Sequence, residues 1–229
     1  MKGIIRYAIV VAALLAGMVS CKKGDNEKLE NENTPVAGFM SARQGSWWLY
    51  ASNENTVVRR VATGRDSVKM GLSYNYYEAT DTTSQYVTPE YFARNGDKFL
   101  MLVDLDGSQT NYMNVVVHKD NPQLGDTWSN TGSISYSGMS FDLLAEGEIT
   151  GVQGTLTING HTYTDVVEIT NTLKAKPQIP PTPVYVNCGT ARMWFQKGIG
   201  LIKSEFDISI ASFYSRHYTD SLLDYHIEP

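Results

Sequence analysis

Short runs rich in β-branched, aromatic and large apolar residues recur along the chain, and turn-forming dipeptides separate them. Asn95-Gly96 separates one pair of such runs, Asn159-Gly160 separates another, and Asp106-Gly107 stands in the same kind of place. The Asn-Gly pair suits the two-residue hairpin turn, because both central residues of that turn need a positive φ. Sequential hairpins predict an antiparallel sheet rather than a parallel sheet with helical crossovers.

The strand-like runs dominate the chain after residue 40, and helical spacing of apolar residues is weak there. About 190 residues fit one large β domain better than two small ones, so we expect a single, mainly β domain over residues 41–229. The short stretch Asp220–Tyr225 offers the best helical pattern, and a terminal strand fits it equally well. The clearest predicted strands are Ser46–Ala51, Ser67–Ala79, Lys98–Asp104 and Asn111–His118.

Residues 1–20 have the layout of a secretory signal peptide. Lys2 and Arg6 give a positive start, and the apolar stretch that follows is too short for a comfortable membrane span. Met18-Val19-Ser20-Cys21 resembles the lipobox of bacterial lipoproteins, with methionine where leucine is usual. The resemblance implies cleavage before Cys21 and acylation of that cysteine, for example with palmitate, which gives a lasting membrane anchor. An ordinary signal peptide with a coincidental cysteine is the alternative.

Residues 21–40 are expected to form a lipidated cysteine followed by a disordered tether, because Lys22–Pro35 is polar, charged and without apolar periodicity. Lipoproteins kept at the inner membrane often carry aspartate directly after the cysteine. Lys22 stands there instead, which favours the outer membrane. Asp25 and Glu27 are similar to surface-export signals of Bacteroidota-type lipoproteins, so the periplasmic face and the cell surface both stay open.

The charge balance argues against a nucleic-acid partner. The chain carries −5 at pH 7, and loss of the signal removes two positive charges and no negative ones, which makes it −7. Binding along a phosphate backbone needs clustered Lys and Arg. Only Cys21 and Cys188 are present, so acylation of Cys21 leaves no disulfide, and we expect Cys188 to pack as a small residue in the sheet.

Four short motifs resemble a loose group of uncharacterised Bacteroidota-type outer-membrane lipoproteins. They are Gly45-Ser46-Trp47-Trp48, Gly125-Asp126-Thr127-Trp128, the run HTYTDVVEI from His161, and Lys197-Gly198-Ile199-Gly200. The resemblance covers most of the domain and implies a strongly curved antiparallel sheet, a half-barrel or barrel-like structure. It implies no catalytic residue.

The run FQKGIGLIKSEF, which contains Gly198 and Gly200, invites comparison with a phosphate-binding loop. Such a loop opens a helix, whereas the residues after Gly200 alternate in polarity as a strand does. We therefore expect Gly198 and Gly200 to let a core strand bend so that the sheet curls.

The sequence contains no strong catalytic or metal-binding motif, and we expect no enzyme, no cofactor and no metal. Asp104-Leu105-Asp106-Gly107 begins like a calcium loop, but Val115 stands where the loop needs glutamate, which favours a hairpin turn. His217, Asp220, Asp224 and His226 have no zinc-site spacing and fit a solvated terminal segment better. Neither a nucleophile elbow nor a His-Glu-x-x-His motif is present.

The sequence therefore favours a membrane-anchored, non-catalytic envelope lipoprotein whose β domain binds a ligand or a partner. One alternative is a carrier or sensor of an apolar or lipid-like ligand. It predicts a cavity lined by residues such as Trp47, Leu49, Leu100, Leu102 and Ile158. The other alternative is a glycan-binding accessory protein, which requires an exposed row of aromatic residues, for example around Tyr74 and Tyr76.

Overall fold

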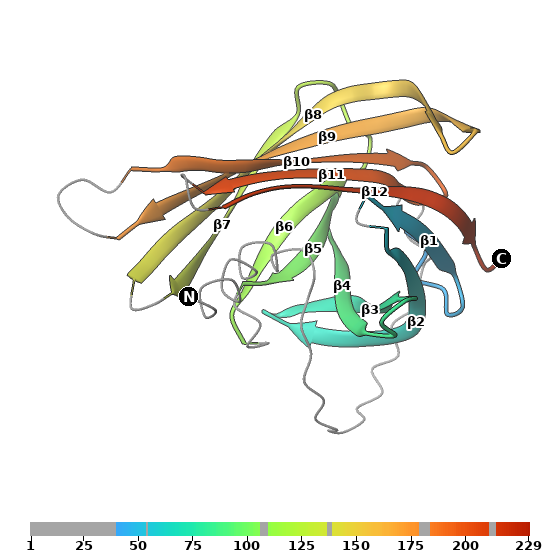
Figure 1. Ribbon diagram of the computed structural model, residues 1–229, viewed down its shortest axis with the longest axis horizontal. Coiled ribbons are helices and arrows are strands. Elements are labelled where there is room, and N and C mark those ends of the chain that lie inside the picture. Colours follow the sequence, from blue (N-terminus) through green and yellow to red (C-terminus); the bar gives the residue numbers. More distant parts are fainter. Residues whose placement is uncertain (1–39, 54, 106–109, 137–138, 179–183, 211–213) are drawn as a thin grey trace.

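The computed structural model describes residues 40–229 except 54, 106–109, 137–138, 179–183 and 211–213 (Figure 1). The predicted signal peptide, Cys21 and the predicted tether up to residue 39 lie outside the described residues, and so does Asp106-Gly107. The described residues form twelve strands: β1 (Trp47–Ser52), β2 (Val57–Lys69), β3 (Leu72–Asp81), β4 (Val87–Asn95), β5 (Lys98–Asp104), β6 (Tyr112–Lys119), β7 (Thr127–Tyr136), β8 (Met139–Ile158), β9 (His161–Pro177), β10 (Val186–Gln196), β11 (Gly200–Ile210) and β12 (Tyr214–His226).

The strands make one antiparallel sheet in the order β6-β5-β4-β3-β2-β1-β12-β11-β10-β9-β8-β7. Every pair except β1 with β12 consists of consecutive strands, as sequential hairpins require. The β1–β12 ladder joins the two ends of the domain, and the sheet curls until it is nearly closed into a barrel (Figure 1). The prediction of one strongly curved antiparallel sheet is confirmed.

Of the two predicted Asn-Gly turns, one lies where the sequence predicts it and the other is shifted by one residue. Asn159 and Gly160 both have positive φ (51° and 83°) between β8 and β9, as an Asn-Gly turn predicts. The turn between β4 and β5 is shifted by one residue, because Asn95 still pairs with Lys98 and only Gly96 has positive φ. The predicted strand Ser67–Ala79 is wrong: Met70 and Gly71 form a tight turn in its middle, and methionine rarely adopts the positive φ of 50° found there.

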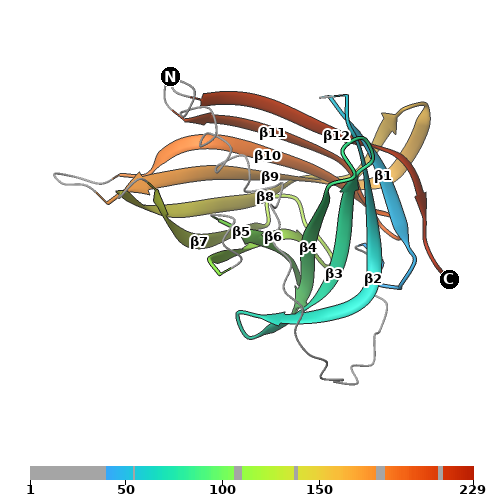
Figure 2. The same cartoon turned by 60° about the horizontal axis from the view of Figure 1, so that its bottom comes forward.

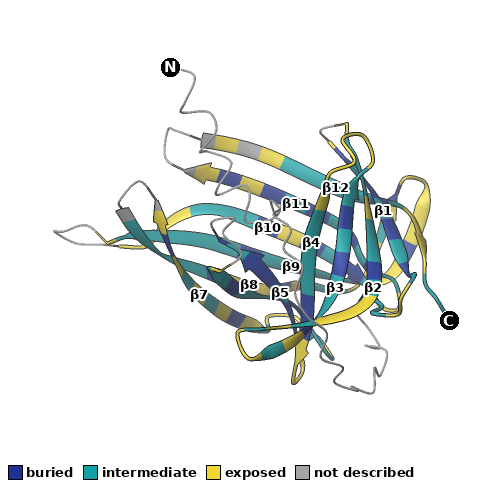
Figure 3. Ribbon diagram, turned by 90° about the horizontal axis from the view of Figure 1, so that it is seen from below, coloured by how far each residue is buried: buried dark blue, intermediate teal, exposed yellow. Residues whose placement is uncertain are grey.

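Alternation along the strands places one face of the sheet in the interior of the barrel. In β1 the side chains of Trp48, Tyr50 and Ser52 are buried, and those between them are half-buried. Figure 3 shows the same alternation of buried and exposed residues along β11. The described residues contain no helix long and apolar enough to cross a membrane.

The tip of the β2–β3 hairpin (residues 65–76) folds over the outer face of β4, β5 and β6 (Figure 2). A bulge at Thr63 and Gly64 breaks the β2–β3 register, which bends the hairpin. Tyr74 Oη donates to Asn114 Oδ1 on β6, and Lys69 Nζ donates to Tyr112 Oη (2.9 Å). This folded-over hairpin buries part of the outer face, which an isolated half-barrel would expose.

Strands β6 and β7 are the two edges of the sheet, and side chains rather than a ladder close the seam between them. Trp128 Nε1 donates to the carbonyl oxygen of Val116 (3.1 Å), and Val116 N–H donates to Asn130 Oδ1 (3.0 Å). Asn111 Nδ2 donates to the carbonyl oxygen of Ser133 (3.1 Å). These bonds satisfy backbone groups that an open edge would leave unpaired.

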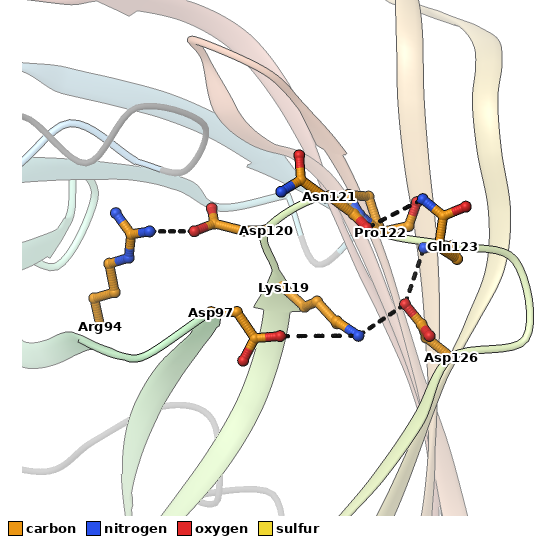
Figure 4. A network of polar contacts seen from close by, with 8 residues as sticks. All are labelled: Arg94, Asp97, Lys119, Asp120, Asn121, Pro122, Gln123 and Asp126. Atoms are coloured by element: carbon orange, nitrogen blue, oxygen red, sulfur yellow. Dashed lines mark hydrogen bonds and ion pairs between the residues drawn. The ribbon is translucent and has the colours of Figure 1, made fainter.

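A network of ion pairs continues this closure at one end of the seam (Figure 4). Lys119 Nζ lies 3.0 Å from Asp126 Oδ2 and 3.9 Å from Asp97 Oδ2, and Arg94 pairs with Asp120. The carboxylate of Asp126 also accepts a hydrogen bond from the backbone N–H of Gln123. This hydrogen bond is the main reason why the pKa of Asp126 is lowered. The network joins the β4–β5 turn to the β6–β7 loop. Because its groups are partly exposed to water, each pair contributes little to stability.

His118 on β6 lies in the core between two phenylalanine rings, with ring centroids 5.8 Å from Phe99 and 5.1 Å from Phe195. Burial lowers the pKa of His118 from 6.5 to about 4, because the charged ring would lose its hydration. Unfolded chains therefore take up a proton at this residue below pH 6.5, whereas folded chains do so only near pH 4. The free energy of unfolding is therefore unaffected by protonation of this residue above pH 6.5. It falls by up to about 3 kcal/mol as the pH drops from 6.5 toward 4, because protons bind the unfolded chain more tightly.

We expect His118→Gln to flatten the fall in the free energy of unfolding between pH 7 and pH 4. Urea denaturation at a series of pH values measures that slope. The matched control is His161→Gln, because His161 is exposed at the start of β9. An unchanged slope in His118→Gln would contradict the assignment.

Candidate functional site

A cavity of about 60 Å³ lies inside the barrel, and its walls come from eight strands on both sides of the β1–β12 ladder. Most of the lining is apolar, but one side carries charged and hydroxyl groups. The lining residues are Met40, Tyr50, Arg60, Glu90, Phe92, Met101, Val117, Met193, Phe195, Leu201, Ser204, Phe206, Tyr218 and Asp220.

The polar side of the cavity is built on the ion pair of Arg60 and Glu90. Arg60 Nε contacts Glu90 Oε2, and Arg60 Nη2 donates to Glu90 Oε1 (3.1 Å), so the contact is bidentate. Strand β3 lies between the two partners, with Ala79 opposite Arg60 and Tyr77 opposite Glu90. The two side chains are only 12% and 18% exposed. Few ion pairs are so far removed from water, because desolvation is costly.

Aromatic rings surround the guanidinium. Its carbon lies 4.9 Å from the ring centroid of Tyr50 and 6.0 Å from that of Phe92. Burial has the largest single effect and would lower the pKa of Arg60, but Glu90, Tyr50 and Asp220 together outweigh burial and raise it. Arg60 is therefore positively charged at every pH at which the protein is folded.

The hydroxyl groups of the cavity remain protonated. Burial raises the pKa of Tyr50 and of Tyr218, and the nearby Asp220 raises that of Tyr218 further. Tyr50 Oη donates to the carbonyl oxygen of Leu201 (2.9 Å), and Tyr218 is hydrogen-bonded to Asp220. The site thus holds one guanidinium and two carboxyl groups among neutral hydroxyls.

Met40 forms part of the wall and is the first described residue of the chain. It is 2% exposed, and the carbonyl oxygen of Ser41 next to it accepts from Tyr77 Oη (3.1 Å). Met40 is therefore packed into the core of the β domain.

The run FQKGIGLIKSEF forms the turn between β10 and β11, and not a bend within a strand as expected. Gly198 (φ 81°) lies in the turn and Gly200 (φ 105°) is the first residue of β11. The turn is held from β1, because Trp48 Nε1 donates to the carbonyl oxygen of Ile199 (2.7 Å). A Cβ at Gly200 would lie 2.6 Å from Met40 Cγ, so this glycine makes room for the wall of the cavity.

We expect Gly200→Ala to cost about 1–2 kcal/mol more than Gly198→Ala, because both positions have positive φ and only Gly200 faces Met40. A Cβ at Gly198 meets nothing within 4 Å, which makes it the matched control. Urea denaturation measures both variants, and the Met40 methyl signal in NMR spectra reports its displacement. Equal costs would show that Met40 does not depend on Gly200.

None of the five residues predicted to line a cavity lines the cavity that contains Arg60 and Glu90. Trp47 and Leu49 alternate with the inward residues Trp48 and Tyr50, and Trp47 stacks on His226, with ring centroids 6.3 Å apart. The physical reason is that WWLYAS has a large residue at four consecutive positions, so apolarity alone does not give the inward face.

Leu100 and Leu102 are buried on the outer face of β5, while Met101 between them points into the cavity. Leu102 pairs with Tyr91 on β4 and with Asn114 on β6, and Asn114 contacts the folded-over hairpin. Ile158 is buried in the main core at the end of β8, where the adjacent Asn159 Nδ2 donates to the carbonyl oxygen of Leu222 (3.0 Å). Ligand binding by these five residues stays a prediction.

The residues considered for a metal site and for a glycan platform do not form either site among the described residues. His217 Nδ1 lies 2.6 Å from Asp207 Oδ1, and His226 Nε2 lies 3.2 Å from Glu228 Oε1, both on the exposed side of β12. No group of three or more potential metal ligands occurs among the described residues. Tyr74 is fully buried and Tyr76 packs on Tyr91 with ring centroids 5.4 Å apart, so they form no exposed platform.

Sequence reasoning missed Arg60 and Glu90 and assigned Asp220 to the solvated tail. The available signal was local: Arg60 shares its strand face with Ala62, and Glu90 shares its face with Phe92, and both of these neighbours are buried. A charge on the apolar face of a strand is uncommon, because burying it is costly. Such a charge indicates a buried partner or a site.

Comparisons with known proteins identify similar structures only. No family model matches the chain, and no curated protein matches it. One similar solved structure is a candidate lipoprotein from Parabacteroides distasonis ATCC 8503, with 12% identity, a TM-score of 0.48, and coverage of 83% of this chain and 99% of that one. Another is the hypothetical lipoprotein YmcC from Escherichia coli K12, with 13% identity, a TM-score of 0.33, and coverage of 80% and 85%.

Proposed function

We propose that this chain is a lipid-anchored, non-catalytic protein of the cell envelope whose β domain binds a small molecule in its interior. The signal layout of residues 1–20 and the lipobox-like Met18–Cys21 support anchoring through Cys21, and Lys22 supports the outer membrane. The tether of residues 21–40 then separates the lipid from the β domain of residues 41–229, which Met40 joins.

The observation that carries the binding proposal is the Arg60–Glu90 pair beside the cavity. A barrel needs no ion pair for its fold, because well-packed apolar residues of the same volume are often equally stable. Sites that hold ligands combine apolar walls with a few convergent polar groups. Arg60, Glu90 and Asp220 are the convergent groups here, and the aromatic and methionine side chains are the walls.

The size of the cavity favours a small molecule over the whole lipid of a carrier. Pockets for drug-sized ligands measure about 300–1,000 Å³, whereas this cavity measures about 60 Å³. An acyl chain would require the core to open.

Two measurements test the proposal. Growth on labelled palmitate should label the protein, and Cys21→Ala should lose the label and release the protein from the membrane fraction. Native mass spectrometry of the mature protein, extracted in mild detergent, should show a bound small molecule that Arg60→Met with Glu90→Met removes. An unlabelled protein contradicts the anchor, and an unliganded one contradicts the binding function.

A further inference from the structure

The cavity contains a hydrogen-bond donor that the described protein does not satisfy. Arg60 Nε and Nη2 both bind Glu90, but Arg60 Nη1 is buried and has no hydrogen-bond partner among the described residues. An unsatisfied buried donor is unfavourable, and more so on a charged group. Tyr50 and Asp220 line the same cavity, but no acceptor of the described residues meets Arg60 Nη1 with hydrogen-bond geometry, and a ligand or a water molecule would supply one.

The charges around this donor disfavour ionic ligands. Glu90 and Asp220 outnumber Arg60, so a carboxylate or phosphate would enter a region of net negative charge. An ammonium group carries only donors, so it would leave Arg60 Nη1 unsatisfied and would lie near a second cation. Only an uncharged acceptor satisfies the donor without adding charge.

The remaining walls select an apolar body of limited size. Phe92, Phe206, Met101 and Met193 present rings and thioethers rather than further polar groups. A cavity of 150 Å³ holds benzene, so about 60 Å³ takes a molecule or a terminal group of only a few non-hydrogen atoms. Methionine walls adapt to the shape of what they contact.

We infer that the cavity takes an uncharged molecule with an acceptor oxygen on a short apolar body, the class of amides, ketones and esters, and that Arg60 Nη1 donates to its oxygen. The inference rests on the proposed function and names its ligand class.

The test uses the mature chain with ¹³C-methyl methionine and three probes with one carbon skeleton: propionamide, propionate and propylammonium. The Met40, Met101 and Met193 methyls line the cavity and report binding there, and those of Met70 and Met113 are internal controls outside it. Propionamide is expected to shift the three cavity signals saturably and to leave the controls unchanged. Propionate and propylammonium at the same concentration are expected to shift none of the three.

The variant Arg60→Met with Glu90→Met removes the donor together with its partner charge, and it should bind propionamide about tenfold or more weakly. Xenon, an apolar probe, should still shift the cavity signals of that variant. If this double variant does not fold, Arg60→Lys keeps the charge, removes Nη1 and should weaken propionamide binding by a similar factor.

Several outcomes would overturn the inference. Binding of propionate or propylammonium as tight as that of propionamide would refute the ligand class and leave the binding function standing. Unchanged propionamide affinity in the double variant would refute the role of Arg60. If xenon alone shifts the cavity signals of the wild type, the requirement for an acceptor oxygen on the ligand is refuted. Met40→Ala shortens a side chain that lines the cavity. If no probe shifts the cavity signals in the wild type or in Met40→Ala, the ligand class and the binding function are both refuted.

Discussion

Gly147→Ala is expected to destabilise the domain by about 3 kcal/mol, because the added methyl group has no space at the seam. A Cβ at Gly147 would lie 2.1 Å from Trp128 Nε1, 2.3 Å from Trp128 Cε2 and 2.7 Å from Asn171 Oδ1. The indole is rigid and its Nε1 bonds the carbonyl oxygen of Val116 across the seam. Moving the indole therefore breaks a bond that holds β7 to β6, in addition to straining the core.

Urea denaturation measures this loss, and Gly151→Ala on the same strand is the matched control. A Cβ at Gly151 would lie 3.2 Å from Glu168 Cβ, an approach that a small shift relieves, so we expect a cost below about 1 kcal/mol. In a Trp128→Leu background the effect of Gly147→Ala should shrink by at least about 1 kcal/mol, because the two residues share one space. Additive effects would show that the indole does not press on Gly147.

Glu90→Ala is expected to cost about 3 kcal/mol, because it leaves the guanidinium of Arg60 buried without its bidentate partner. Asp220 near Arg60 compensates in part, which places the expected cost at the lower end of the range for broken buried pairs. Replacing both partners by methionine should be close to neutral, since no charge is then left in the interior. The free energies of unfolding of the wild type, Glu90→Ala and the double methionine variant together separate two quantities. One is the cost of burying an unpaired charge, and the other is the net contribution of the ion pair to stability.

The exposed pair of Arg65 and Glu78 is the matched control for Glu90. Its side chains are 64% and 41% exposed, and Arg65 Nη2 lies 2.8 Å from Glu78 Oε1. Glu78→Ala should cost less than about 1 kcal/mol, because water replaces the lost partner. Equal costs for Glu78→Ala and Glu90→Ala would show that the interior pair is as well solvated as a surface pair.

Local signals were sufficient to predict an antiparallel sheet of sequential hairpins. Asn159-Gly160 predicts its hairpin correctly because two residues with positive φ are enough to reverse the chain. Met70-Gly71 carries no comparable signal, and a real turn was therefore read as part of one strand. Gly198 and Gly200 were correctly separated from phosphate loops, but the difference between a bend and a turn depends on whether β10 and β11 pair.

The candidate site depended on contacts that no local pattern contains. Arg60 and Glu90 are thirty residues apart and meet only because β2 and β4 flank β3 in the sheet. Asp220 joins them because β1 pairs with β12, the last strand of the chain. The expected cavity residues Trp47, Leu49, Leu100 and Leu102 lie on the outer face of their strands, away from the cavity that contains Arg60 and Glu90.

By itself the sequence determined an all-β domain of sequential hairpins, because turn residues and alternation act over a few neighbouring positions. The tertiary structure decided which face of each strand turns inward, which hairpin folds over the outside, and how the seam is closed. Those features follow from bulges such as Thr63-Gly64 and from pairings between distant strands, where a shift of one residue moves every side chain to the opposite face. The charged cavity is a product of that closure, since its walls come together only when the sheet has curled upon itself.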